Sequence, residues 1–450
     1  MTVAARPSWQ PGGEELWAPS DSQLGMILDP SENVQFQLQW PGFIDSGAFG
    51  EALRELAQRH DVLQTTYVTD LQGKVWARTQ STACPKPEFI DLRGAPQSSL
   101  ANVVQTVLTQ NAGHAFDLAN GPLLRTTVLA LDEGRSAVFC AVHHSIFDWA
   151  SQPIFSTQLR TLYAARTTTA PAGLAAPPMQ FRDFAINQRK WLDGPAGVPH
   201  IEYWERRLAG GQFMFALPYD SPAIQDPAEA APQAGCAALG AGYHALRQLA
   251  LRQRTTMFNL VAAAFLLILG RWSGCSDRGT WITHLGRSRP EHLQLIGCFA
   301  NFWLLRVDLS GDPTFLEAAA RVASACKESL PHREVTLQRL MPVLQRIRGD
   351  TRFPSIVFNY INKRPDSPGA ADDAVLPQYA GARASPHLGR GSPLALNVQL
   401  CDDGRSVTWS MQYAPHLFRA TTVARLFGEL AAVLDKVAAQ PLLRAADWAP

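Results

Sequence analysis

The chain has 450 residues, of which 46% are hydrophobic, and its 40 Lys and Arg residues nearly balance its 39 Asp and Glu residues. This balance gives no electrostatic reason to expect nucleic acid or an anionic membrane as the main partner. A chain of this length is expected to form two lobes of roughly 200 residues each, and its apolar content is ample for burial.

The sequence predicts neither secretion nor membrane insertion. The N-terminus lacks the apolar stretch of a signal peptide, so residues 1–14 are expected to form a flexible tail on a cytoplasmic protein. The most apolar segment, Leu260–Leu269, is too short to span a bilayer and is expected to be a buried core helix. The seven cysteines show no paired C-x-x-C spacing, so neither a disulfide framework nor a zinc site is expected.

Hydrophobic periodicity predicts a mixture of helices and strands along the whole chain. Helices are predicted over Ser46–His60, Ala150–Ala165, Thr255–Trp272, Pro313–Leu330 and Ala420–Ala438. Strands are predicted over Val62–Tyr67, Thr126–Leu131, Ala137–Val142, Trp281–Leu285, Phe302–Val307, Leu394–Leu400 and Val407–Tyr413, the last two joined as a hairpin.

Two Pro-rich segments interrupt this pattern. Thr167–Pro178 is rich in Thr, Ala and Pro and is the preferred boundary, which predicts an N-terminal lobe over residues 15–178 and a C-terminal lobe over residues 179–450. The second segment, Pro222–Gly235, is expected to be a surface loop.

The clearest chemical signal follows the apolar strand Ala137–Val142, in the six residues from His143 to Asp148. The two adjacent histidines, His143 and His144, are expected at the C-terminal end of this strand, where sites in α/β folds tend to lie. Adjacent side chains on an extended backbone point to opposite faces. One histidine is therefore expected to pack into the fold and the other to face a cavity.

A histidine pair at a strand end is more often structural than catalytic, but the aspartate five residues after His143 can reach back to fix a loop or a ring. Two histidines and one aspartate form a poor zinc set, because zinc normally takes three or four protein ligands. A serine hydrolase is not indicated, since no Gly-x-Ser-x-Gly elbow is present. General-base or proton-positioning chemistry remains.

The segment His143–Asp148 resembles the His-His-x-x-x-Asp-Gly motif of the condensation domains of nonribosomal peptide synthetases. Companion segments that resemble other motifs of this family are Ser20–Gln23, Arg59–Thr65, Gln180–Ala185, Gly286–Glu291 and Ile296–Asn301. Their order and intervals agree with the family over about residues 19–440, nearly the entire chain.

The resemblance implies an α/β (α+β) fold of two chloramphenicol acetyltransferase-like lobes in a V-shaped pseudo-dimer with a central tunnel. His144 would face the tunnel, and His143 would be a hydrogen-bonded scaffold residue. Asp148 would pair with Arg287 from the second lobe and so support the site. The remaining candidates for the tunnel wall are Ser22, Trp149, Asn301 and Trp303, and for Trp303 a core position is slightly favoured over the tunnel wall.

The function that the resemblance implies is a free-standing condensation enzyme of natural-product (antibiotic) biosynthesis. It would transfer an acyl group from the phosphopantetheine thioester of a peptidyl or acyl carrier protein to an amine or hydroxyl, with His144 as general base or positioning residue. The acceptor would be a small molecule or carrier-bound. The expected protein is a monomer with no bound cofactor or metal. Two alternatives stay open: a coenzyme A-dependent O/N-acyltransferase and a catalytically silent recruitment module.

One departure from the family pattern bears directly on function. Trp149 stands where the family has Gly after the Asp of its motif, and Ala150 follows. Glycine is used where φ is positive or a ligand passes close to the backbone, so an indole at this position can change the pocket. Three outcomes stay open: Trp149 reshapes the pocket for an unusual substrate, packs harmlessly, or blocks one entrance and leaves a binding protein.

Overall fold

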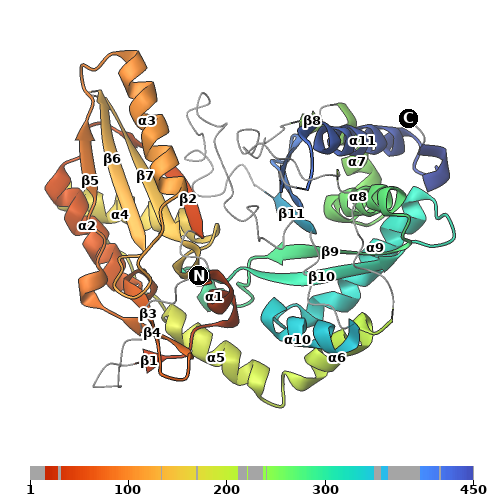
Figure 1. Ribbon diagram of the computed structural model, residues 1–450. Coiled ribbons are helices and arrows are strands. Elements are labelled where there is room, and N and C mark those ends of the chain that lie inside the picture. The colour runs from red at the N-terminus through yellow and green to blue at the C-terminus, as the bar shows by residue number, and fades with distance from the viewer. Residues whose placement is uncertain are drawn as a thin grey trace. The chain divides into compact units, whose positions relative to one another are not determined.

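The computed structural model describes residues 16–28, 32–132, 134–168, 171–210, 220, 237–239, 241–348, 356–362, 396–414 and 417–448. The predicted tail over residues 1–14 and the predicted loop Pro222–Gly235 lie outside these residues. The described residues form a mixed α/β fold with two compact units (Figure 1). The first unit contains the described residues up to Val198 together with Leu285–Ala300, and the second contains residues 199–284 and the described residues from Asn301 on.

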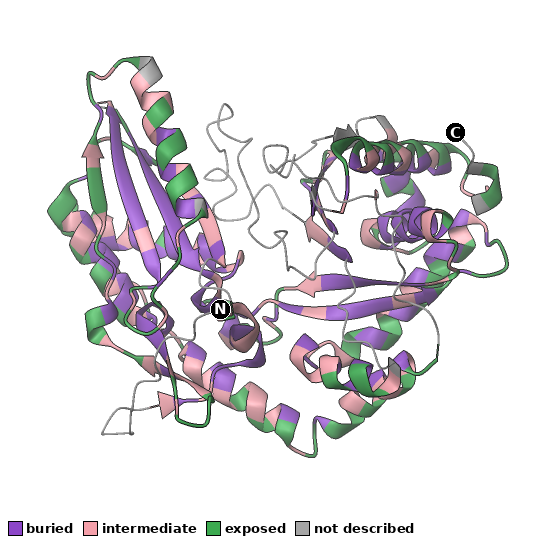
Figure 2. Cartoon of the chain, viewed as in Figure 1, coloured by how far each residue is buried: buried purple, intermediate pink, exposed green. Residues whose placement is uncertain are grey.

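The first unit is built on a four-stranded sheet. Its order is β2 (Asn33–Pro41), β7 (Arg135–His143), β6 (Leu124–Asp132) and β5 (Glu88–Asp91). Only the pairing of β5 with β6 is parallel. Helix α3 (Gln97–Ala112) covers one face, while α2 (Ser46–Arg59) and α4 (Ser151–Thr167) pack together on the other (Figure 1). Because both faces are covered, β7 is buried along nearly its whole length, which explains its continuous apolar run (Figure 2).

Smaller elements complete the first unit. They are a three-stranded sheet of β1 (Leu16–Trp17), β4 (Val75–Thr79) and β3 (Thr65–Thr69), with the helices α1 (Asp21–Met26) and α5 (Phe181–Asp193). The prediction of a strand over Val62–Tyr67 is wrong in its first half, because Asp61–Gln64 forms a 3-10 helix. The Leu63 N–H donates to the His60 carbonyl at 3.0 Å, so the chain turns here before it extends.

The second unit is built on a six-stranded sheet. Its order is β10 (Asn301–Asp308), β9 (Asp277–His284), β11 (Ile356–Asn362), β12 (Leu396–Asp402), β13 (Val407–Tyr413) and β8 (Ala237–Leu239). Its helices are α6 (Val198–Leu208), α7 (Ala241–Arg252), α8 (Met257–Ser273), α9 (Phe315–Ser329), α10 (Leu337–Arg348) and α11 (Ala420–Ala439). The predicted hairpin at Asp402–Gly404 is confirmed by the antiparallel pairing of β12 and β13.

Helix α8 is the predicted core helix, and every residue from Asn259 to Gly270 is buried (Figure 2). No single helix among the described residues is long and apolar enough to cross a membrane. Helices α7 and α8 meet the criteria of length and composition only when taken together, and they are bent by 108° at their junction.

The first unit does not end at the expected boundary of residue 178. It includes α5 and receives the segment Leu285–Ala300 from far along the chain. This segment belongs to the first unit because its apolar side chains join the core beneath α2 and α4. The residues concerned are Leu295, Ile296, Cys298 and Phe299, each at most 1% exposed.

Candidate functional site

The histidine motif begins where strand β7 ends. His143 is the last residue of the strand, and His144–Ile146 form a 3-10 turn. His143 is completely buried, with its Nδ1 2.7 Å from the Ser145 hydroxyl oxygen and 3.3 Å from the Ser145 backbone nitrogen. Because the backbone N–H can only donate, Nδ1 of His143 is the acceptor and Nε2 carries the proton. His143 is therefore a hydrogen-bonded scaffold residue.

His144 lies in a different environment. It is the one residue from His143 to Asp148 that is not buried. Its backbone N–H donates to the Glu32 carbonyl at 2.7 Å, while its ring Nδ1 has no hydrogen-bond partner among the described residues. The two histidines thus differ as strand alternation predicts, and His144 is the one that is partly exposed.

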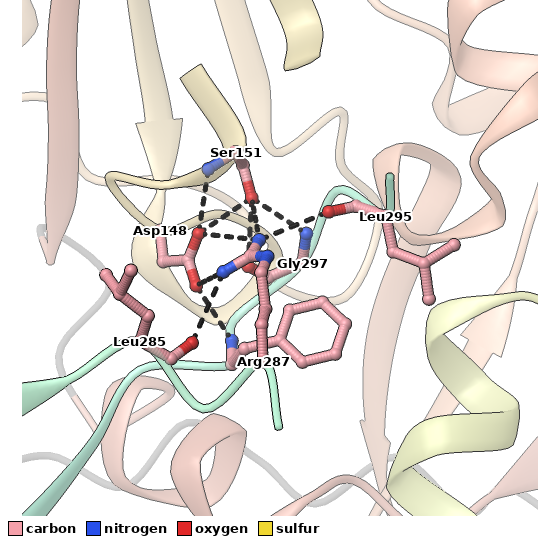
Figure 3. Close-up of polar contacts among 7 residues, drawn as sticks. Asp148, Ser151, Leu285, Arg287, Leu295 and Gly297 are labelled. Carbon is pink, nitrogen blue, oxygen red and sulfur yellow. Dashed lines mark hydrogen bonds and ion pairs between the residues drawn. The ribbon is translucent and has the colours of Figure 1, made fainter. Parts of the chain in front are cut away.

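Asp148 is a buried carboxylate with five hydrogen-bond donors. Its Oδ2 lies 2.6 Å from Arg287 Nη1 and its Oδ1 lies 2.9 Å from Arg287 Nη2, a bidentate pair with both side chains at most 4% exposed (Figure 3). The backbone N–H and hydroxyl of Ser151 donate to Oδ1 at 2.9 and 2.8 Å, and the Phe299 N–H donates to Oδ2 at 3.1 Å. These donors satisfy a charge that would be costly to bury alone.

The structure contains the expected pair of Asp148 and Arg287, but the expectation that Arg287 comes from the second lobe is wrong. Arg287 belongs to the first unit, in the segment Leu285–Ala300. Gly286 lets this segment approach closely, since its φ is +65° and an added Cβ would lie 1.9 Å from the Phe299 carbonyl oxygen. The Arg287 guanidinium also lies 4.4 Å from the centre of the Phe299 ring.

Ser151 is a part of this network that sequence reasoning missed. It is the first residue of α4 and is completely buried. Besides donating to Asp148, its hydroxyl accepts the Gly297 N–H at 3.0 Å and a bond from Arg287 Nη2 at 2.9 Å (Figure 3). The serine thus joins the start of α4 to the segment Leu285–Ala300. A serine three residues after the motif aspartate, at a helix start, is a signal that could have marked it.

The other candidate residues lie in both units. Ser22 is buried in α1, and its neighbour Gln23 is the residue that reaches the motif. Trp149 is half-buried in the turn before α4. In the second unit, Asn301 begins β10 and its side-chain amide donates to the Arg333 carbonyl at 3.3 Å, while Trp303 is buried at 5% exposure.

His332 ends a 3-10 helix in the second unit. Its ring stacks on Tyr203 with a centroid distance of 3.8 Å and an interplanar angle of 6°. Among the described residues, no group of three or more His, Cys, Asp and Glu side chains could hold a metal ion.

The sequence matches the Condensation domain family over residues 30–448. A linear gramicidin synthase protein of Brevibacillus parabrevis is 30% identical over 411 residues, which cover 91% of this chain and 8% of that protein. Phosphinothricin tripeptide synthetase PhsC of Streptomyces viridochromogenes is 31% identical over 413 residues, which cover 92% of this chain and 38% of that protein. The chain therefore spans only a small part of these relatives.

Solved structures give the same assignment. The X-domain from teicoplanin biosynthesis is 27% identical, with a TM-score of 0.79 and 99% of each chain covered, and a second structure shows an X-domain in complex with OxyB. The SgcC5 protein from Streptomyces globisporus shares the fold, with a TM-score of 0.77 at 22% identity over 95% of this chain and 100% of that chain. The chain belongs to the condensation-domain family, which confirms the resemblance of its motifs.

Proposed function

We propose that the protein is an acyltransferase that forms an amide or ester from a carrier-bound thioester, with His144 at the reacting centre. The nucleophile is an amine or hydroxyl, whose lone pair attacks the thioester carbonyl carbon. The C–S bond then breaks, and the proton lost by the nucleophile ends on the phosphopantetheine thiol. A thioester is already activated, so the reaction needs no covalent acyl-enzyme and no bound cofactor.

One observation supports this role for His144 above all others. Of the six motif residues, it alone is not buried, while its ring Nδ1 is itself inaccessible and has no hydrogen-bond partner among the described residues. An imidazole within about 3 Å of the nucleophile can accept its proton or orient it as the tetrahedral intermediate forms. Holding both reactants together supplies a further part of the rate.

In this proposal Asp148 supports the site indirectly, because its carboxylate bonds to residues other than His144. Its two oxygens take bonds from Arg287, Ser151 and Phe299, so the carboxylate is committed to the loop rather than to the histidine ring. The arrangement differs from a Ser-His-Asp triad, in which the acid holds the imidazole. Asp148, His143 and Arg287 are therefore proposed as positioning residues.

The experiment is replacement of His144 by Ala, with candidate acyl-loaded carrier proteins and acceptors and with product detected by mass spectrometry. The expected loss of product is about 10²-fold or more, the usual contribution of a general base. His244→Ala is the matched control, because His244 is exposed on α7 in the second unit. Undiminished turnover by the His144→Ala protein would overturn the assignment. Supplying the same acyl group as a coenzyme A thioester tests the alternative of a coenzyme A-dependent acyltransferase, which would form product from that donor.

A catalytically silent recruitment module is the second candidate, favoured by the likeness to the teicoplanin X-domain, a structure of which holds OxyB. Under that hypothesis the protein would bind a partner enzyme, and the His144→Ala substitution would leave this binding unchanged. Neither the unsubstituted protein nor the His144→Ala variant would form product. Trp149, in place of the family glycine, is the residue that keeps this candidate open. Replacing Trp149 by Gly would then be expected to restore turnover.

Several finer expectations stay predictions that rest on the family resemblance. They are the V-shaped pseudo-dimer with its central tunnel, the lining of that tunnel by Ser22, Trp149, Asn301 and Trp303, and the docking of a peptidyl or acyl carrier protein. The free-standing form, the monomeric state and the cytoplasmic location also stay predictions.

A further inference from the structure

Ser145, the residue after His144, is held by hydrogen bonds to its backbone N–H and to its carbonyl. Ser145 is completely buried, and its backbone N–H and hydroxyl both lie within hydrogen-bond distance of His143 Nδ1. Its carbonyl accepts two further bonds, from Gln23 Nε2 at 3.0 Å and from the Tyr67 hydroxyl at 3.3 Å. Gln23 and Tyr67 lie 122 and 78 residues away in the chain, on α1 and β3.

The two donors also support each other. Gln23 Nε2 donates to the Tyr67 hydroxyl oxygen at 2.9 Å, and the two side chains are 0% and 5% exposed. Burial raises the pKa of Tyr67 above its ordinary value, so the hydroxyl keeps its proton and remains a donor. Both N–H groups of the Gln23 amide are thereby used, one on Tyr67 and one on Ser145.

The orientation of the Gln23 amide is determined by the start of α1. Its Oε1 accepts the Ser20 N–H at 3.0 Å, and the Ser20 hydroxyl accepts the Gln23 N–H at 3.2 Å, which is a capping box. Helix α1 is in turn fastened to α5, because Arg189 donates to Asp21 Oδ1 and to the Pro19 carbonyl, each at 3.2 Å. The capping box and the contacts of Arg189 therefore orient the Gln23 amide nitrogen toward Ser145.

The backbone conformation at His144 itself is also held by hydrogen bonds. Its own N–H donates to the Glu32 carbonyl at 2.7 Å, and its carbonyl accepts the Phe147 N–H at 3.3 Å. Its ring Nδ1 takes no hydrogen bond from the described residues. Hydrogen bonds therefore hold the backbone from which the imidazole projects, and the bonds to Ser145 are part of that support.

We propose that Gln23 and Tyr67 are positioning residues for His144, acting through the Ser145 carbonyl. This inference rests on the proposed function, in which the His144 ring must lie within about 3 Å of the nucleophile. A misplacement of about 1 Å at such a centre can lower the rate by about 10²-fold. Neither residue touches the reacting atoms in this proposal.

The first test needs no substrate. The variants are Tyr67→Phe and Gln23→Met in the full chain, with Tyr243→Phe as the matched control. Tyr243 is a buried tyrosine of the second unit whose hydroxyl lies 2.8 Å from Asp402 Oδ1. In nuclear magnetic resonance spectra of ¹⁵N-histidine-labelled protein, the His144 ring signals, assigned with a His144→Gln variant, are expected to shift in the first two variants and to stay in place in the control.

A purely structural role makes a different prediction for these spectra. Tyr67→Phe and Tyr243→Phe would then lower the melting temperature by similar amounts and leave the His144 signals unchanged in both. That result would overturn the proposal. A His144 shift without any turnover by the unsubstituted protein would retain the positioning role and count against the proposed function.

The second test follows turnover. Tyr67→Phe is expected to lower kcat about 5-fold and Gln23→Met about 10- to 100-fold, with KM within about 2-fold, because the substrate contacts are unchanged. The double variant is expected to lose no more than Gln23→Met alone, since Gln23 also donates to the Tyr67 hydroxyl and so orients it toward Ser145. Additive losses, or a loss in Tyr243→Phe equal to that in Tyr67→Phe, would contradict the proposal.

Discussion

The Asp148 carboxylate accepts five hydrogen bonds, and its removal from water depends on Arg287. Both side chains are at most 4% exposed, and the two residues share two bonds of 2.6 and 2.9 Å. A buried pair of this kind is weak evidence for net stabilisation, but the loss of one partner leaves a buried charge without compensation.

Arg287→Ala is therefore expected to lower the free energy of unfolding by about 3–5 kcal/mol. The matched control is Arg289→Ala, because the Arg289 side chain is 69% exposed and lies 3.9 Å from Glu291, and such a surface pair contributes at most about 1 kcal/mol. Urea unfolding followed by tryptophan fluorescence measures both. Equal losses for the two variants would show that the buried pair does not carry the expected free energy.

The motif residues were predictable, whereas their supports were not. Adjacent histidines at a strand end predict one buried and one accessible ring, and the family resemblance implies the bond from Asp148 to Arg287. The capping-box spacing of Ser20 and Gln23 predicts a helix start, but no local pattern shows that the same glutamine reaches Ser145, 122 residues away. Supports of this kind depend on tertiary packing.

The end of strand β9 carries a titratable group, His284, which is half-buried. His284 Nε2 lies 3.0 Å from the Arg333 carbonyl oxygen, and a carbonyl can only accept, so Nε2 carries the proton. Burial lowers the pKa of His284 from 6.5 to about 4. The folded state therefore binds a proton more weakly than the unfolded state.

This shift makes stability depend on pH in a defined window. The stabilisation is present above the unfolded pKa of 6.5 and is lost as the pH falls through the folded pKa of about 4. The free energy of unfolding is expected to fall by up to about 1.4 kcal/mol per pH unit for this one proton. In the first unit, His60, whose pKa is also lowered to about 4 by burial, adds a dependence of the same sign.

His284→Gln is expected to remove about one proton from the pH dependence of unfolding between pH 6.5 and pH 4. The glutamine amide can still donate to the Arg333 carbonyl and does not titrate. Urea titrations at several pH values measure the slope, and His244→Gln, on the exposed face of α7, provides the comparison. A slope identical to that of the unsubstituted protein would rule out His284 as its source.

At the level of elements, the long periodic segments were predictable and the short irregular ones were not. The runs that became β7 and α8 are apolar over most of their length, and both are buried. The alternating sequence Val34–Trp40 was missed, although it forms most of β2 and has the period of a strand. Val62–Gln64 was misassigned because Val62 and Leu63 suit a strand. The bonds of the Asp61–Gln64 turn to His60 and to Gln180, just before α5, favour the 3-10 helix instead.

The compact units of the molecule are not two continuous stretches of sequence. The predicted boundary placed all residues after 178 in the second lobe, whereas the first unit takes in α5 and the segment Leu285–Ala300. Composition marks a linker but cannot show that a later segment returns to an earlier core. That return depends on the match between its buried apolar side chains and the core beneath α2 and α4.

A fragment of residues 1–198 is expected to lack cooperative unfolding, since it lacks Arg287 and the four buried apolar residues that complete its core. Addition of residues 285–300 through a flexible Gly/Ser linker of about 20 residues, with an end-to-end reach of roughly 25 Å, is expected to restore it. Near-ultraviolet circular dichroism and binding of a hydrophobic dye distinguish the two states. Cooperative unfolding of the shorter fragment would show that the returning segment is dispensable for the fold.

The order in which a ribosome makes the chain has a consequence for this arrangement. Asp148 precedes Arg287 by 139 residues, so at about 5–20 residues per second its carboxylate is made roughly 10–30 seconds before its counterion. Until then the apolar core of the nascent first unit lacks the side chains of Leu285–Ala300. The Asp148 carboxylate beside it lacks its Arg287 counterion. Folding of the loop around Asp148 during synthesis must therefore wait until the segment Leu285–Ala300, which follows strand β9, is translated. We expect the nascent chain to need most protection from aggregation during this interval.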